Sequence, residues 1–320
     1  TIRVMTLLGI KLSPTKRHKM RTTQHFLGAS NDLSRIQSDE AVVFGPKLGG
    51  REALIGVIQS HRSSQSLSST DASSLRGKSQ WLDSQLFGRP CRGAFSALIA
   101  RQYYEHAVHI TPNMSFSLDC IESAAENMPC RHISFTRARR LPVVVYSDCS
   151  SGGQYGLRVG ILIFHPTKGV FAFSVDPPQS FIDTWLPRDN YINLGELIAG
   201  PITCSVFGAL LRNEDVVWFV DNTSALSALI RRASSTEDLN TLALVFGLSM
   251  SALHARVWFE YVQSASNPSD VLSRDAWADP DVQRRLASGE WTRVDAAVPW
   301  HSYSIAQVPD LFRAFQASLE

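Results

Sequence analysis

Apolar stretches of strand length follow one another in the second half of the chain. PVVVYSDCS, GLRVGILIFHP and GVFAFSVDP lie between positions 142 and 177 and are separated by Gly, Pro, Ser and Lys. β-Branched and aromatic residues bounded by turn residues are typical of strands. Because the connections are short, we predict that these three strands are neighbours in an antiparallel meander.

Helical and strand patterns alternate after the meander. The sequence predicts a helix over 193–211, a strand over 215–220, and helices over 222–232 and 238–253. The strand ARVWFEYV and the helix start NPSDVLSR follow. Crossover connections through helices place strands parallel in one sheet. We therefore predict a mixed sheet whose last strands are parallel and whose first and fourth strands are adjacent.

The first half of the chain has a more helical pattern. Residues 1–35 predict a basic turn followed by a short hairpin. A helical pattern begins at a cap on Thr70 or Asp71 and continues to Glu105. A further amphipathic helix, SFSLDCIESAAENMP, ends at Pro129. The apolar stripe of the first helical pattern consists of Leu75, Trp81, Leu82, Leu86 and Phe87.

The composition is that of a globular chain with room for two domains. Its 320 residues are 44% hydrophobic and 19% charged, which argues against disorder. The five cysteines are scattered and form no CxxC pair, so we expect an intracellular location, cytoplasmic or nuclear, without structural zinc. No apolar run approaching the ~20 residues of a membrane span is expected, and hence no membrane partner. Because the chain begins with Thr1, we expect it to be part of a longer protein.

Charge is divided unevenly along the chain. Residues 1–140 carry 19 Lys and Arg against 10 Asp and Glu, a net charge of +9. Residues 141–320 carry 12 against 19, a net charge of −7. This division favours a surface that binds a polyanion beside a surface rich in carboxylates. Two solvated surfaces of opposite sign are the alternative.

Four acids lie at the boundaries of predicted elements: Asp148, Glu196, Asp221 and Asp270. The carboxyl ends of adjacent strands form the ligand crevice of an open α/β sheet, and Asp148 and Asp221 follow two strands predicted to be adjacent. Carboxylates that close repel one another unless a cation lies between them. Oxygen ligands without His or Cys favour Mg²⁺ or Mn²⁺. Two such ions can promote hydrolysis of a phosphodiester.

Each acid taken alone also has a structural explanation. Asp221 could cap the helix that follows it, and Asp270 could stabilise the first turn of its own helix. Asp148 could belong to an ordinary turn, and Glu196 could be a solvated helix residue. The order of the four acids and their joint placement favour a metal site.

Residues 141–280 resemble the ribonuclease H domain of retroelement reverse transcriptases. The motifs that carry the resemblance are VVVYSDCS, INLGELIAG, VVWFVDNTSALSAL and VQSASNPSDVLSR. The resemblance implies an α/β fold with a ribonuclease H-like, mixed five-stranded sheet flanked by helices. It also implies a nuclease with two Mg²⁺ ions, or Mn²⁺. Asp148 and Asp221 would then hold the ion pair, Glu196 would ligate one ion and Asp270 the other.

The upstream sequence resembles other parts of a reverse transcriptase. GIKLSPTKRHKMRTTQHFLGASNDLS is similar to the end of the palm, and LRGKSQWLDSQLFGRPCRGAF to the connection of DIRS-like and Gypsy-type elements. The polymerase motif Tyr-x-Asp-Asp is absent, so polymerisation is not expected of this chain alone. The implied divisions are a palm end (1–35), a mostly helical thumb/connection region (36–140), a ribonuclease H-like domain (141–286) and a C-terminal tail (287–320).

The resemblance also implies the substrate and the partner. The expected substrate is an RNA–DNA hybrid whose RNA strand is cut, and the expected partner is the remainder of the reverse transcriptase polyprotein. A basic cluster near the start of the chain is the candidate for phosphate contacts, with a solvated turn as the alternative. It consists of Lys11, Lys16, Arg17, Lys19 and Arg21.

Two residues depart from the pattern of the family. Cys149 follows the first acid where Ala or Gly is usual, and Pro201 lies five residues after Glu196 within the predicted helix. Proline in a helix interior costs about 3 kcal/mol, so a kink or a late helix start could misdirect Glu196. A catalytically decayed fold that binds the hybrid is therefore the main alternative. A DNA strand-transfer enzyme is a weaker one, because such enzymes carry Glu where this chain has Asp270.

Overall fold

A mixed six-stranded sheet forms the centre of the second half of the protein. The strand order is β10-β7-β6-β5-β8-β9. Strands β5, β6 and β7 are antiparallel neighbours, whereas β5, β8 and β9 run parallel. The predicted meander and the predicted adjacency of the first and fourth strands are both confirmed. The strands are β5 (Val143–Ser150), β6 (Arg158–His165), β7 (Gly169–Val175), β8 (Asp215–Val220), β9 (Arg256–Tyr261) and β10 (Trp291–Arg293).

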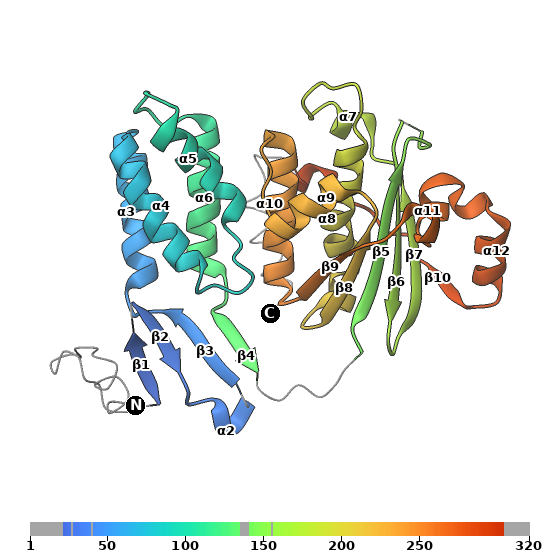
Figure 1. Ribbon diagram of the computed structural model, residues 1–320, viewed down its shortest axis with the longest axis horizontal. Coiled ribbons are helices and arrows are strands. Elements are labelled where there is room, and N and C mark those ends of the chain that lie inside the picture. Colours follow the sequence, from blue (N-terminus) through green and yellow to red (C-terminus); the bar gives the residue numbers. More distant parts are fainter. Residues whose placement is uncertain (1–21, 27, 40, 135–140, 155, 304–320) are drawn as a thin grey trace, which may run out of the picture.

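The protein is described here from a computed structural model, which covers residues 22–26, 28–39, 41–134, 141–154 and 156–303 (Figure 1). The prediction of five strands is wrong by one, because β10 pairs in parallel with β7. This strand has only three residues, and of these only Trp291 is buried. It therefore has no alternation that could reveal it in the sequence. It also lies in the segment that the sequence assigned to a tail.

Helices cover both faces of the six-stranded sheet (Figure 1). Helices α8, α9 and α10 pack on one face, and α11 and α12 lie on the other, where Leu272 and Val282 join Leu162 of β6 in a separate apolar cluster. The described chain in this half is thus α/β with a mixed sheet flanked by helices. The helices are α7 (Gln179–Ile182), α8 (Ile192–Leu211), α9 (Thr223–Arg231), α10 (Glu237–Ala252), α11 (Asp270–Arg274) and α12 (Pro280–Ala287), with short 3₁₀ turns at Ser264–Ser266, Ala276–Ala278 and Trp300–Tyr303.

Helix α8 is more apolar than the sequence reading allowed. Its 20 residues have a mean hydropathy of 1.6, which is long and apolar enough for a membrane span. The expectation that no run approaches this length is therefore wrong. However, 72% of its most apolar 18-residue window is buried inside the protein, between the sheet and α10. Its composition is explained by burial on all sides.

The described residues of the first half form five α-helices, one of them a single turn, and a small antiparallel sheet. The sheet has the order β1-β2-β3-β4, and the predicted hairpin corresponds to β1 and β2. The rest of this sheet was not predicted, because β4 follows β3 only after four intervening helices. The elements are β1 (Thr23–Phe26), β2 (Ala29–Asp32), α2 (Ile36–Asp39), β3 (Ala41–Pro46), α3 (Gly50–Ser64), α4 (Ser69–Asp83), α5 (Phe95–Tyr103), α6 (Pro112–Asn127) and β4 (Arg131–Ser134), with a 3₁₀ turn at Arg92–Ala94.

Helix α4 differs from its prediction in three respects. Ser68 is the N-cap and accepts a hydrogen bond from the Asp71 backbone N–H, so neither predicted cap is used. Trp81 is 46% exposed and does not belong to the buried stripe. The helix also ends at Asp83 rather than continuing: Leu86 then pairs with Cys130, and the chain turns at Gly88 and Arg89, which both have positive φ. A turn of this kind interrupts any helix.

The two halves meet at this turn. Asn240 of α10 donates a hydrogen bond to the Gly93 carbonyl over 3.0 Å. The Phe87 ring stacks on His254, with the ring centroids 5.5 Å apart. The α4–α5 connection is thereby held against α10 and the start of β9.

Candidate metal centre

Two parallel strands bring the first pair of acids together. Asp148 lies near the end of β5, and Asp221 directly follows β8. Ser147 of β5 pairs with Val220 of β8, so the two acids leave the sheet at the same edge. This is the placement that the sequence predicted from the crossover rule.

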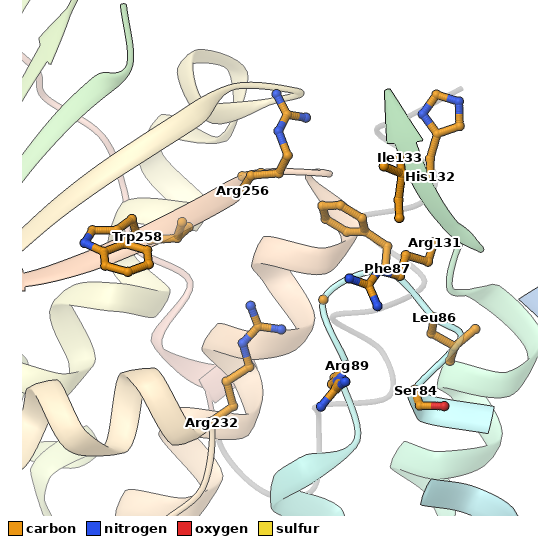
Figure 2. A pocket seen from close by; sticks show the side chains of 13 residues that line it. Ser84, Leu86, Phe87, Arg89, Arg131, His132, Ile133, Arg232, Arg256 and Trp258 are labelled. Carbon is orange, nitrogen blue, oxygen red and sulfur yellow. The ribbon is translucent and has the colours of Figure 1, made fainter. Parts of the chain in front are cut away.

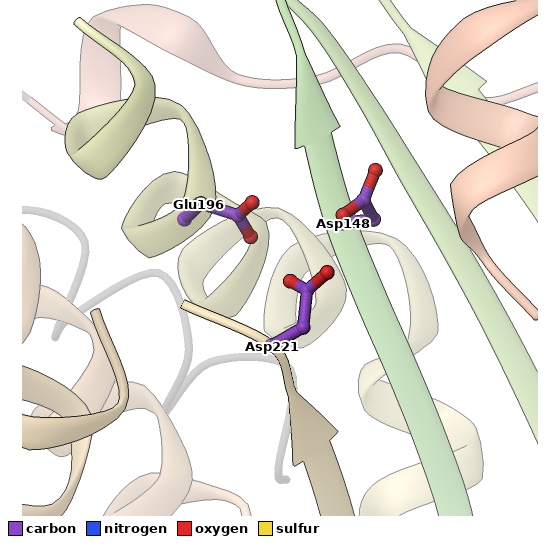
Figure 3. A group of neighbouring side chains, drawn as sticks. All are labelled: Asp148, Glu196 and Asp221. Atoms are coloured by element: carbon purple, nitrogen blue, oxygen red, sulfur yellow. The ribbon is translucent and has the colours of Figure 1, made fainter. Parts of the chain in front are cut away.

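Helix α8 supplies the third acid. Glu196 lies just over one turn after the helix start, and its carboxylate points towards those of Asp148 and Asp221 (Figure 3). One oxygen of each carboxylate lies within 4.8 Å of one oxygen of each of the others. Asp148 and Glu196 are each only 4% exposed, whereas Asp221 is partly exposed. The three acids converge from elements that are far apart in the sequence.

Pro201 does not turn Glu196 away from this cluster. Helix α8 begins at Ile192 and continues through Pro201, and the one residue with non-helical backbone angles is Phe207. Steric conflict before a proline involves the side chain of the preceding residue, and here that residue is Gly200. The glycine also lies against the Phe246 ring, which a Cβ would approach to 2.8 Å. The expected misdirection of Glu196 is not observed.

Asp270 occupies a different position from the other three acids. It begins α11 and lines the same pocket, of about 310 Å³, but it is not part of the group within 4.8 Å. Its carboxylate accepts a hydrogen bond from Arg274 Nε over 2.7 Å. The structure thus brings three of the four predicted acids together and places the fourth, with its arginine partner, at the rim.

The structural explanation holds for Asp270, which lies in the first turn of α11, but the explanations for the other three acids fit less well. The N-cap of α9 is Asn222, whose side chain accepts hydrogen bonds from the Ser224 and Ala225 N–H groups, so Asp221 is not the cap. Glu196 is buried rather than solvated. Asp148 lies in a strand rather than a turn.

The NPSDVLSR motif anchors α11 beside Asp148. Asn267 donates a hydrogen bond to the Ser147 carbonyl over 3.1 Å, and Ser273 Oγ donates one to Asp148 Oδ2. Close approach of this segment requires Gly160, opposite Asp148 in the sheet, because a Cβ there would lie 2.6 Å from the Ser273 nitrogen. The sequence analysis singled out only the acid of this motif. It did not predict the anchoring roles of Asn267 and Ser273, although both residues belong to the motif.

Burial and mutual repulsion disfavour the charged form of these acids. Burial, with smaller contributions from Asp221 and Asp270, raises the pKa of Asp148 to about 6, against the hydrogen bond from Ser273. Burial and then the Asp148 charge raise the pKa of Glu196 well above its ordinary value. Such shifts are expected where carboxylates share a site without a counter-charge.

The donor set fits a hard divalent cation. Glu196 Oε2 is buried and has no hydrogen-bond partner within the part of the chain that the structure describes, and a buried unpaired carboxylate oxygen is costly. Cys149 lines the same pocket, but its sulfur does not belong to the group of ligand atoms that lie within 4.8 Å of one another. The cluster therefore offers oxygen ligands alone, which suit Mg²⁺ or Mn²⁺.

No protein-family model matches this chain, and no curated protein matches its sequence. The chemistry of the site therefore has to be argued from its own residues. The predicted basic cluster from Lys11 to Arg21 lies outside the described residues.

Proposed function

We propose that this protein is a metal-dependent nuclease of the ribonuclease H type that cuts the RNA strand of an RNA–DNA hybrid. The observation that carries the proposal is the convergence of Asp148, Glu196 and Asp221 within 4.8 Å from β5, α8 and β8. The antiparallel meander followed by parallel strands supports a ribonuclease H-like fold, in which the acids occur in the same order along the chain.

The carboxylates of Asp148, Glu196 and Asp221 would hold the metal, with Asp270 available at the rim of the pocket. A bound pair of divalent ions supplies Lewis acidity and lowers the pKa of a water molecule. The protein's own part is to keep these oxygens charged and oriented. Ser273 does so for Asp148, and Asn267 fixes the backbone of α11 on β5.

The proposed substrate, an RNA–DNA hybrid, is the one implied by the resemblance of the four motifs to ribonuclease H domains. Selectivity for a hybrid would arise from contacts to the 2′-hydroxyl and from duplex shape rather than from base reading. By the same resemblance, cleavage would leave 3′-hydroxyl and 5′-phosphate ends. The protein would act as part of a retroelement reverse transcriptase, and the metal ions would be Mg²⁺ or Mn²⁺.

Cleavage of an end-labelled RNA annealed to DNA tests this proposal, with RNA alone and duplex RNA as controls. We expect cleavage of the hybrid only, abolished by EDTA and by Asp148→Asn. A matched control is Asp295→Asn, because Asp295 is a surface acid that pairs with Arg293 away from the site. A folded protein that binds the hybrid but never cuts it would indicate a catalytically decayed module instead.

A further inference from the structure

A second polar hollow lies where the first half of the protein meets the edge of the six-stranded sheet. Its volume is about 630 Å³. The α4–α5 connection and β4 form one wall, and the end of α9 and the start of β9 form the other (Figure 2). A neighbouring hollow of about 460 Å³ shares Ser84 and Arg89 with it. The two hollows adjoin at these shared residues and together form one groove.

Arginine dominates the lining of this groove, which we call the arginine groove. Its six arginines are Arg89, Arg92, Arg131, Arg231, Arg232 and Arg256. Among the described lining residues the only acid is Asp83, which is buried and accepts a hydrogen bond from the Cys91 N–H over 2.8 Å. The groove therefore carries a strong positive charge.

The arginines differ in how they are paired. Arg256 is bound to Asp215, with Nε 2.6 Å from the carboxylate. Arg89 and Arg131 are exposed, and no ion pair joins either of them to another described residue. Arg89 comes from the α4–α5 connection and Arg131 from β4 (Figure 2). Their guanidinium groups are available to a ligand.

Arg232 gives the strongest sign of an anionic ligand. Its Nη1 is buried and has no hydrogen-bond partner among the described residues. Its stem packs on Gly247, where a Cβ would lie 3.0 Å from Arg232 Cδ, so the side chain is held in place. Burial lowers the pKa of Arg232 to about 10, which leaves it charged at neutral pH. The Asp83 carboxylate offsets part of this charge, but a buried guanidinium nitrogen without a hydrogen-bond partner remains costly unless an anion approaches it.

Exposed aromatic surface accompanies the positive charge. Trp258 of β9 lines the groove and is 69% exposed. It pairs with Val217 of β8, four residues before Asp221, so it lies roughly 13 Å from the metal centre along the strand direction. Grooves that bind single strands combine arginines along the backbone with aromatic rings on which bases stack.

We propose that the arginine groove binds the phosphodiester backbone of a single nucleic-acid strand, with one base stacked on Trp258. The number of separate arginines in its lining favours a strand over an isolated phosphate, because successive phosphates could each meet a different guanidinium. The site does not depend on the metal centre, and it extends the proposed function by a second contact for nucleic acid.

Fluorescence anisotropy of a labelled oligodeoxythymidylate of about 12 nucleotides, in EDTA, tests this proposal. A DNA strand cannot be cut by a ribonuclease, and EDTA removes any contribution from bound metal. Arg89→Gln and Arg131→Gln are the main variants, because both side chains are exposed, whereas a change at Arg232 could disturb folding. The matched control is Arg284→Gln, an exposed arginine of α12 paired with Asp281. Thermal unfolding verifies that each variant is folded.

The wild-type protein is expected to bind the strand with an affinity that falls steeply with salt. Each groove variant should weaken binding several-fold. It should also reduce the steepness of the plot of log affinity against log salt concentration by roughly 0.7, the value for one lost phosphate contact to a single strand. Trp258→Ala should cost about fivefold or more, while Arg284→Gln and Asp148→Asn should bind as the wild type does.

Equal binding by the wild type and the groove variants would overturn the proposal, and so would absence of binding by the wild type. Inorganic phosphate at matched ionic strength separates the two sources of the ligand. A strand that contacts several arginines at once should bind far more tightly than single phosphate ions. If inorganic phosphate, at the concentration of phosphate groups present in the strand, displaces the strand, the groove is a phosphate site and the proposal is overturned. Loss of hybrid cleavage with this binding retained would overturn only the nuclease proposal.

Discussion

Gly195 of α8 lies directly against Cys149 of β5. A Cβ on Gly195 would stand 2.3 Å from Cys149 Sγ, so the helix can approach the strand only because position 195 has no side chain. Glu196 directly follows Gly195 in the sequence, and Asp148 directly precedes Cys149. The unusual cysteine and the glycine together set the separation of two acids in the candidate metal centre.

Gly195→Ala should therefore push α8 away from β5. We expect a loss of roughly 1–3 kcal/mol in the free energy of unfolding, as is typical of overpacking, and weaker Mn²⁺ binding. Both quantities are measurable, by urea denaturation and by calorimetric titration. Cys149→Ala in the same chain should restore much of the loss, because it removes the sulfur. A single Gly195→Ala variant as stable as the wild type would contradict this account of the contact.

The metal-free protein should lose stability as pH rises from about 4 to about 6. The pKa of Asp148 is about 6 in the folded protein, against an ordinary value of 3.8, so in this range the folded state keeps a proton that the unfolded state has released. Stability then falls with increasing pH, by up to about 3 kcal/mol from this one group. The free energy of unfolding in EDTA at pH 4 and pH 7 measures the effect.

Asp148→Asn provides the comparison for that pH dependence, since asparagine does not titrate. The variant should show a smaller decrease between the two pH values. Adding Mg²⁺ at pH 7 should stabilise the wild-type protein by mass action and the variant much less. Parallel pH curves for the two proteins would show that Asp148 is not responsible.

Ser273→Ala should impair the site without unfolding the protein. The Ser273 hydroxyl donates a hydrogen bond to Asp148 Oδ2, and loss of such a partner of a ligand typically costs 10- to 100-fold in metal affinity or activity. Mn²⁺ titration and hybrid cleavage measure the two effects. Ser288→Ala is the matched control, because among the described residues the Ser288 hydroxyl bonds only locally, to the Arg285 carbonyl and the Glu290 N–H. Unchanged metal affinity would show that Ser273 serves packing alone.

Pro201→Ala should stabilise the protein. An alanine there can donate the hydrogen bond to the Leu197 carbonyl that proline lacks, and interior proline is costly in a helix. We expect a gain of about 1 kcal/mol or more in the free energy of unfolding, with hybrid cleavage unchanged. Pro280→Ala is the control, since Pro280 is the first residue of α12 and sacrifices no such bond. A destabilised Pro201→Ala protein would mean that the proline ring is needed for packing.

The local pattern of the sequence was sufficient to predict most strands of the six-stranded sheet and the placement of two of the acids. The strands β5 to β9 have continuous apolar runs bounded by turn residues, and the crossover rule makes β5 and β8 neighbours. That is enough to bring Asp148 and Asp221 to one edge. It was not enough for β10, where a three-residue strand has no periodicity.

Contacts between distant residues decided the rest. Glu196 joins the cluster because Gly195 and Gly200 let α8 pack closely on β5 and α10 despite Pro201, and Asp270 is held at the rim by Arg274. The arginine groove likewise gathers residues from the α4–α5 connection, β4, α9 and β9. The sequence alone determined which elements form, because strand and helix periodicity are local properties. Only the tertiary structure decided which charged groups face one another, because that depends on how closely those elements pack.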